Sequence, residues 1–413
     1  MQSRLSPELR QYGLITGNYW AFTLTDGALR MLVVLYFHQL GYAPLQIALL
    51  FLFYELFGVI TNLVGGWLGA RLGLNRTMNI GLGLQILALA LLLVPVSWLT
   101  VPWVMAAQAL SGIAKDLNKM SAKSAIRLLV PRQGPAAETE GRLYQWVALL
   151  TGSKNALKGA GFFLGGLLLA WLGFAGAVAA MAAMLALVWI FSIIMLKPDL
   201  GRVRHKPKFT DIFSKSRAIN VLSAARLCLF GARDVWFVVA LPVFLASEFG
   251  WDHWRVGGFL ALWVVGYGLV QSLAPYVTGK RAGRVPDGRT VFGWALALTL
   301  VPAMIALGVG GESYPHETLI GGLLLFGAIF AINSSLHSYL IVSYASDDGV
   351  SLDVGFYYMA NAMGRLLGTL LSGWVYQQSG LVACLWFSAG LLLLAAMLSL
   401  KLPRWRKSLA ERE

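Results

Sequence analysis

Long apolar stretches recur along the whole chain, separated by short polar connections. A helix needs about 20 apolar residues to cross the hydrocarbon core of a bilayer. Because backbone polar groups must be satisfied inside the bilayer, stretches of this kind predict helices. We therefore expect an all-α integral membrane protein with twelve transmembrane spans, at 12–38, 46–70, 77–97, 102–128, 144–171, 174–196, 218–247, 254–279, 290–309, 318–343, 353–378 and 381–402.

Composition agrees with this interpretation. Of 413 residues, 58% are apolar and 13% are charged, whereas soluble domains are about 45–50% apolar and 25% charged. An ordinary soluble enzyme, a disordered chain and a nucleic-acid-binding module are excluded as classes. Cys228 and Cys384 both lie in apolar runs, so we expect small buried side chains and neither a disulfide framework nor a metal site. No cofactor is expected.

A polar, basic segment at 197–217 divides the chain into two sets of six spans. We expect an N-terminal six-helix bundle at 1–196, a basic cytoplasmic linker at 197–217, and a C-terminal six-helix bundle with a short basic tail at 218–413. Arg71 and Gly73 follow the second span, and Arg281 and Gly283 follow the eighth span in the same spacing. This echo between equivalent turns is typical of parallel six-helix repeats.

The basic residues outside the spans give an orientation. With a cytoplasmic N-terminus, 22 of the 33 Lys and Arg residues fall in segments on the cytoplasmic side of the membrane. One, Arg255, falls in a loop on the opposite side. Cytoplasmic loops carry such an excess of Lys and Arg. The split predicts an even number of spans with both termini cytoplasmic.

Ten basic residues remain within the predicted spans, although a charge at the bilayer centre costs at least about 2.5–3.5 kcal/mol. They are Arg30, Lys115, Lys119, Lys123, Arg127, Lys154, Lys158, Arg226, Arg233 and Arg365. The four acidic residues that share this environment are Asp26, Glu55, Asp116 and Asp234. Spans three, six, nine and twelve carry none of these charges. The charged spans are therefore expected to line a wet cavity.

Helix periodicity places many of these cations on common faces. Lys115, Lys119, Lys123 and Arg127 recur every four residues, and Lys154 and Lys158 do the same. The excess of cations over acids predicts a site for a multiply charged anion. The residues predicted to bind it are Arg30, Lys115, Lys119, Lys154, Lys158, Arg226, Arg233, Asn361 and Arg365.

Structural roles are the alternative for part of this set. Lys123 and Arg127 lie near a span end, where their side chains can reach the interface. The spacing of Asp26 and Arg30 is that of an ion pair within one helix. Lys115, Asp116 and Lys119 can partly neutralise one another.

Three carboxylates are candidates for proton coupling: Asp26, Glu55 and Asp234. Glu55 has no neighbouring cation in its own helix. Asp26 and Asp234 each have an arginine nearby in sequence, which a bound anion would compete for.

Two short patterns resemble the major facilitator superfamily. Gly66, Arg71, Gly73 and Arg76 match its loop signature, although Ala70 stands where the family has aspartate. The resemblance implies a cytoplasmic gate at Arg71, Gly73 and Arg76. In span five, the glycines at 152, 161 and 165 have the spacing of the superfamily's antiporter signature, with Gly166 replacing its proline. Close helix packing through small residues is the alternative explanation for these glycines.

Five longer stretches resemble a specific branch, the organoarsenical efflux permeases of the ArsJ type: 18–35, 65–79, 109–125, 150–166 and 216–245. The resemblance implies export of 1-arseno-3-phosphoglycerate across a bacterial inner membrane, and hence arsenate resistance. It also implies a functional link, without physical contact, to glyceraldehyde-3-phosphate dehydrogenase, which forms this compound from arsenate. The substrate is a small anion, and the protein is expected to be a monomer.

Three alternatives remain. An organophosphate/phosphate antiporter of the same fold would have the same cation-lined cavity. A non-transporting membrane sensor would need a signalling domain, for which 197–217 and the tail are short. An intramembrane enzyme would need a catalytic constellation, and the sequence has no P-loop, HExxH or GxSxG motif. We therefore expect a protein that is not an enzyme.

Overall fold

The computed structural model describes residues 7–42, 50–131, 135–197, 200–203, 208, 216–278, 285–311, 315–347 and 349–404. In this described part every regular element is helical, which confirms the predicted all-α class. The elements are α1 (Pro7–Gln39), α3 (Leu52–Leu72), α4 (Leu74–Leu91), the short 3-10 helix η1 (Val96–Trp98), α5 (Val101–Leu129), α6 (Ala136–Met195), α7 (Arg217–Phe237), α8 (Ala240–Ser247), α9 (His253–Thr278), α10 (Gly288–Val309), α11 (Pro315–Tyr344) and α12 (Val350–Ser399).

Two glycines divide the longest helices into pairs of spans. Gly173 in α6 has φ 66° and Gly380 in α12 has φ 73°. This left-handed conformation is accessible to glycine at little cost, so the chain turns sharply there. With these two breaks, and with α7 and α8 taken together, each predicted span overlaps a helical segment. By length and apolarity alone, eight helical stretches of the described part qualify as membrane spans.

One predicted span is too long at its end. The third was expected to reach residue 97, but α4 ends at Leu91. Pro95 follows and begins the turn that leads into η1. Proline has no backbone N–H to donate and cannot continue the helix, which explains the early end.

The described residues pack as two compact units. Unit 1 comprises residues within 1–133, 153–214 and 345–359, and unit 2 comprises residues within 134–152, 215–344 and 360–413. The first turns of α6 therefore group with unit 2, and the first turns of α12 with unit 1. The division of the chain into two six-helix bundles on either side of a linker at 197–217 stays a prediction.

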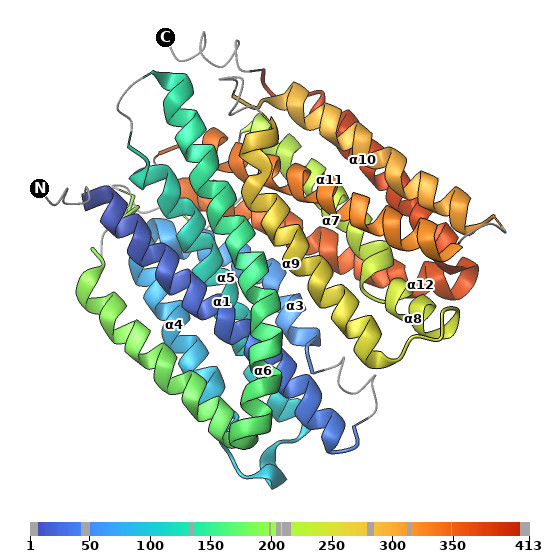
Figure 1. Ribbon diagram of the computed structural model, residues 1–413. Coiled ribbons are helices and arrows are strands. Elements are labelled where there is room, and N and C mark those ends of the chain that lie inside the picture. The colour runs from blue at the N-terminus through green and yellow to red at the C-terminus, as the bar shows by residue number, and fades with distance from the viewer. Residues whose placement is uncertain are drawn as a thin grey trace, which may run out of the picture. The chain divides into compact units, whose positions relative to one another are not determined.

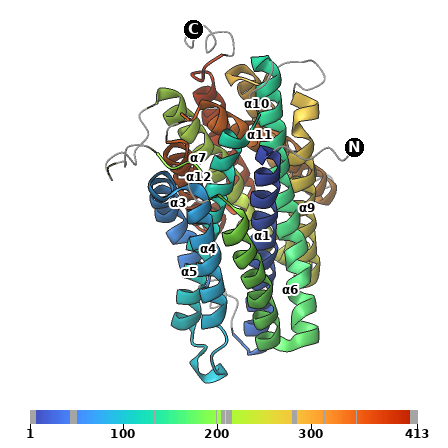
Figure 2. The same cartoon turned by 90° about the vertical axis from the view of Figure 1, so that its left-hand side faces the viewer.

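In unit 1, α5 packs against α1, α3 and α4 (Figures 1 and 2). An apolar core at one end of this group includes Leu32, Phe37 and Phe174. Tyr36 stacks on Phe174 with ring centroids 4.1 Å apart.

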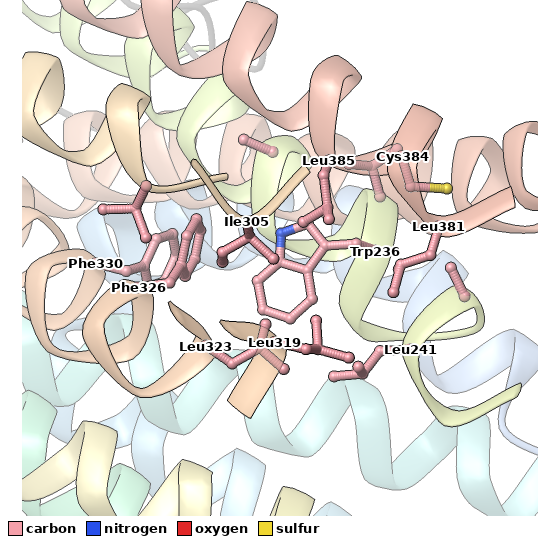
Figure 3. Packing of buried hydrophobic residues seen from close by; sticks show 14 of the residues in the cluster. Trp236, Leu241, Ile305, Leu319, Leu323, Phe326, Phe330, Leu381, Cys384 and Leu385 are labelled. Atoms are coloured by element: carbon pink, nitrogen blue, oxygen red, sulfur yellow. The ribbon is translucent and has the colours of Figure 1, made fainter. Parts of the chain in front are cut away.

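The core of unit 2 surrounds Trp236 of α7, whose side chain is fully buried (Figure 3). Trp236 meets Phe326 of α11 edge to face, with ring centroids 4.9 Å apart. Such aromatic pairs add about 0.5–1.5 kcal/mol beyond the burial of their area. Cys384 lies in this core, and both cysteines are free and buried, as expected.

Candidate functional site

Close contact between α1 and α6 brings a lysine to an aspartate in unit 1. A Cβ at Gly27 would lie 2.6 Å from the carbonyl oxygen of Lys158, and one at Gly161 would lie 2.6 Å from that of Leu24. Only glycine allows the two backbones to approach this far. At this contact Lys158 Nζ lies 3.7 Å from Asp26 Oδ2. The glycine spacing in span five therefore has a packing role here.

A second contact, between α3 and α5, fixes Tyr54 among charged groups. A Cβ at Gly112 would lie 2.6 Å from the carbonyl oxygen of Tyr54. The Tyr54 hydroxyl donates to Asp26 Oδ1 at 2.6 Å. Lys115 Nζ lies over the Tyr54 ring, 3.8 Å from its centroid. Tyr54 therefore contacts both an acid of α1 and a base of α5.

Arg30 pairs with Glu55 and not with Asp26. Its Nη2 lies 3.4 Å from Glu55 Oε1, so the ion pair joins α1 to α3. The guanidinium also lies 5.0 Å from the ring centroid of Phe51 and 5.2 Å from that of Tyr54. The alternative of an ion pair within α1 is therefore wrong, and Glu55 finds its cation on a neighbouring helix.

Two further lysines on the basic face of α5, Lys119 and Lys123, both contact Tyr358. Lys119 Nζ forms an ion pair with Asp116 at 2.6 Å and lies 4.8 Å from the ring centroid of Tyr358. Lys123 donates to the Tyr358 hydroxyl and is buried. Arg127, one turn further, pairs with Asp347 at 3.2 Å. Asp116 thus neutralises Lys119, whereas Lys115 contacts an aromatic ring.

Lys154 lies half-buried one turn before Lys158 on α6. We group it with the charged residues described above as the unit 1 cluster, which combines cations from three helices with three acids. Its members are Asp26, Arg30, Glu55, Lys115, Asp116, Lys119, Lys123, Lys154 and Lys158.

Unit 2 holds a smaller cluster built on the contact of α7 with α12. A Cβ at Gly364 would overlap the carbonyl oxygen of Leu227, and one at Gly368 would lie 2.7 Å from that of Gly231. The adjacent Arg365 thereby reaches α7, and its Nε lies 3.2 Å from Asp234 Oδ2. Arg233 Nε lies 2.6 Å from Asp234 Oδ1. The fully buried Asp234 therefore bridges two arginines.

Arg226 lies on the same helix and is held by polar groups of two other helices. Its Nε donates to Asn361 Oδ1 at 2.8 Å, and its Nη1 donates to Ser334 Oγ at 3.2 Å. The guanidinium stacks on Phe230, 4.0 Å from the ring centroid. We call Arg226, Arg233, Asp234, Asn361 and Arg365 the unit 2 cluster.

Sequence reasoning missed several polar residues that surround these clusters. Tyr54 and Tyr358 lie within predicted spans, and nothing in the sequence distinguishes them from other aromatic residues there. In α11, the run from Asn333 to Ser338 is buried and polar apart from Leu336. Glu140, near the start of α6, is buried and accepts hydrogen bonds from Tyr339 at 2.8 Å and Ser343 at 2.9 Å. Because Glu140 precedes the predicted span at 144–171, it was not counted among the charges within the membrane.

The expected gate residues lie at the turn between α3 and α4. Gly73 has φ 98° and separates the two helices. Arg71 lies over the Trp67 ring at 5.0 Å, and Arg76 is exposed. The carbonyl of Ala70 accepts a hydrogen bond from Val203 N at 2.9 Å. The position that lacks the superfamily's aspartate is thus used for a backbone contact with the segment at 200–203.

The family model of the Major Facilitator Superfamily matches residues 15–286 and 222–411, which together cover most of the chain. The chain belongs to the Major Facilitator Superfamily. It is accordingly a multi-pass membrane transporter that binds a small-molecule substrate, and it is not an enzyme. No curated protein sequence matches the chain significantly.

Solved structures of superfamily transporters share this fold. The human organic anion transporter MFSD10 (TETRAN) superposes with a TM-score of 0.74 at 17% identity, covering 96% of this chain and 100% of its own. The fucose:proton symporter FucP of E. coli gives 0.71 at 15% identity, covering 95% and 98%. A bacterial homologue of the iron transporter ferroportin, in its outward-facing state, gives 0.72 at 15% identity, covering 95% and 99%.

Proposed function

We propose that this superfamily member is a secondary active exporter of an anionic organoarsenical, 1-arseno-3-phosphoglycerate, working by alternating access and conferring arsenate resistance. The observation that carries the proposal is the excess of cations over acids in each cluster. Burying such charges is costly unless a partner compensates them. A substrate with a phosphate and an arsenate ester supplies several negative charges.

The chemistry of the cations fits oxyanions. Arginine presents a planar set of donors that matches phosphate-like groups, and the unit 2 cluster holds three arginines. Arg226 is fixed by Asn361 and Ser334, so part of its donor set is already oriented. The lysines of the unit 1 cluster are compact point charges on flexible stems, which also suit an oxyanion.

The side chains of this chain suit pentavalent arsenic better than trivalent arsenic. Trivalent arsenic is bound by clustered thiolates, whereas a pentavalent arsenate ester needs only oxyanion donors. The two cysteines are free, buried and on different helices. Among the described residues, no group of three or more His, Cys, Asp and Glu side chains could hold a metal ion. An oxyanion substrate therefore suits this chain better than a soft metalloid ion.

The structural relatives carry substrates of different classes. MFSD10 is described as an organic anion transporter. FucP is described as a fucose:proton symporter. The likeness between the folds does not choose between these substrates, so the choice of an anion rests on the clusters and on the resemblance to organoarsenical permeases.

Location and coupling complete the proposal. The distribution of loop charges supports a membrane protein with both termini cytoplasmic, and the resemblance to organoarsenical permeases supports a bacterial inner membrane. Asp26, Glu55 and Asp234 remain the candidates for proton coupling, and each is ion-paired with a cation of its own cluster. A coupling proton on any of them would release that cation for the anion.

Arsenic accumulation in arsenate-challenged cells tests this function. Cells would express the transporter alone, glyceraldehyde-3-phosphate dehydrogenase alone, or both. Export of the arsenylated product predicts lower arsenic accumulation only when both are present. An Arg226→Gln variant that reaches the membrane serves as the inactive control. Unchanged accumulation in all cells would contradict the proposal, and exchange of phosphate in loaded vesicles would then identify an organophosphate/phosphate antiporter.

A further inference from the structure

Tyr54 contacts a candidate anion ligand and a candidate proton carrier at the same time. Its ring centroid lies 3.8 Å from Lys115 Nζ, and its hydroxyl donates to Asp26 Oδ1 at 2.6 Å. We propose that Tyr54 is a positioning residue that links anion binding at Lys115 to protonation of Asp26. This inference rests on the proposed function, because it takes the unit 1 cluster as an anion site.

Lys115 is the cation of this group that an anion can recruit. Within the described part of the chain, no carboxylate lies at ion-pair distance from Lys115. Asp26, Glu55 and Asp116 pair instead with Lys158, Arg30 and Lys119. Lys115 is half-buried, and its contact is the neutral ring of Tyr54. A charged oxyanion is a stronger partner for an ammonium group than an aromatic face. Anion binding should therefore draw Lys115 off the ring.

The ring itself stays in place. Tyr54 is 2% exposed, its backbone packs against Gly112, and its hydroxyl is anchored on Asp26. The ammonium group of Lys115, in contrast, sits on a flexible four-carbon stem. The part that moves on anion binding is thus the lysine.

Movement of Lys115 away from the ring alters the electrostatic environment of Asp26 in two ways. The ammonium no longer polarises the Tyr54 phenol, whose hydroxyl then becomes a weaker donor to Asp26. A positive charge is replaced by the negative charge of the anion. Both changes favour the protonated form of Asp26. Among the described residues, the other charged or titratable groups around this site are Arg30 and Tyr19 of α1, Glu55 of α3, Asp116 of α5, Lys158 of α6 and Tyr358 of α12.

Protonation of Asp26 has a further consequence for the anion. It removes the carboxylate that holds Lys158 at 3.7 Å, so Lys158 becomes available as a second ligand. Proton and anion therefore bind cooperatively. Anion binding should be accompanied by proton uptake at Asp26.

Calorimetric titration of the purified full-length protein with inorganic phosphate tests the link. Titrations in two buffers of different ionisation enthalpy give both the affinity and the number of protons taken up. The wild type should take up more protons than the ionisation of phosphate accounts for. Tyr54→Phe, which keeps the ring and loses the hydroxyl, should lose this additional uptake while still binding phosphate. Lys115→Gln should weaken phosphate binding about tenfold or more.

Control variants separate this role from a structural one. Tyr36→Phe alters a tyrosine whose ring stacks on Phe174 in the apolar core, and it should match the wild type in affinity and proton uptake. In a Lys115→Gln background, Tyr54→Phe should cause no further change in proton uptake. Asp26→Asn should bind phosphate without the additional uptake, and it decides the question if Tyr54→Phe does not fold.

The outcomes distinguish the two proposals. If the wild type does not bind phosphate, the anion site and this inference both fail. If it binds phosphate but takes up no additional proton, or if Tyr54→Phe or Asp26→Asn keeps the full uptake, the link is wrong while the anion site stands.

Discussion

The two charged clusters use different chemistry. The unit 1 cluster contains five lysines and one arginine. Arg30 and Lys158 pair with acids of neighbouring helices, whereas Lys119 pairs with Asp116 of its own helix. The unit 2 cluster contains three arginines, two of which share the single buried acid Asp234. Lysine is a movable point charge, whereas arginine offers a planar, oriented set of donors. The difference suggests a mobile set of cations in unit 1 and a fixed oxyanion receptor in unit 2.

The fixed character of the unit 2 cluster comes from its neutral partners. Arg226 is held by an amide oxygen, a hydroxyl and a ring, all from described residues of unit 2. In unit 1, Lys115 lies over the face of the Tyr54 ring, a contact that fixes the direction of its ammonium group less than hydrogen bonds fix the Arg226 guanidinium. If this comparison is correct, the clusters should respond differently to substitutions that preserve charge.

Removal of one cation from each cluster should have the largest effect. We expect Arg233→Gln and Lys154→Gln each to abolish transport, because each removes a positive charge from its cluster. Membrane insertion should remain intact, as measured by the amount of protein in purified membranes. Transport would be measured as arsenic efflux from cells that form the arsenylated product. Preserved transport in both variants would contradict the anion site.

Exchange of lysine and arginine should separate the two clusters. We expect Arg226→Lys to reduce transport about tenfold or more, because lysine cannot donate to Asn361 and Ser334 in the same geometry. Lys115→Arg should retain most of the transport, since arginine also stacks on the Tyr54 ring. Initial rates in proteoliposomes give the measurement. Equal losses in the two variants would remove the distinction between a fixed and a mobile cluster.

The glycine contacts that assemble the clusters should matter for stability. Gly161→Ala in unit 1 and Gly364→Ala in unit 2 each place a methyl group against a neighbouring backbone oxygen. Overpacking of this kind costs about 1–3 kcal/mol. Gly13→Ala and Gly373→Ala are matched controls, because an added Cβ meets nothing within 4 Å there. The midpoint of thermal unfolding in detergent should fall in the first two variants. If all four variants unfold alike, the close contacts do not position the charged residues.

Sequence patterns gave the helices and the charged residues but not the partners of those residues. The 3.6-residue repeat placed Lys115, Lys119 and Lys123 on one face because that relation is local to a helix. Contacts such as Arg30 with Glu55 depend on which helices are neighbours and how far each is rotated. The small residues at 27, 112 and 161 fix those relations, and their effect is visible only once the opposing backbones are known. Tyr54 has no charge and no motif, so its central contacts could not be predicted.

The ion pair between Arg30 and Glu55 should have the smallest effect. Its side chains are 28% and 30% exposed, and partly exposed pairs of this kind contribute about 0–1 kcal/mol. We therefore expect Glu55→Gln to change the unfolding midpoint little. Asp234→Asn should lower it clearly, because it leaves Arg233 and Arg365 beside a buried neutral amide. Thermal unfolding of both variants under identical detergent conditions makes the comparison. A larger loss from Glu55→Gln than from Asp234→Asn would show that the mobile cluster, and not the fixed one, carries the electrostatic contribution to stability.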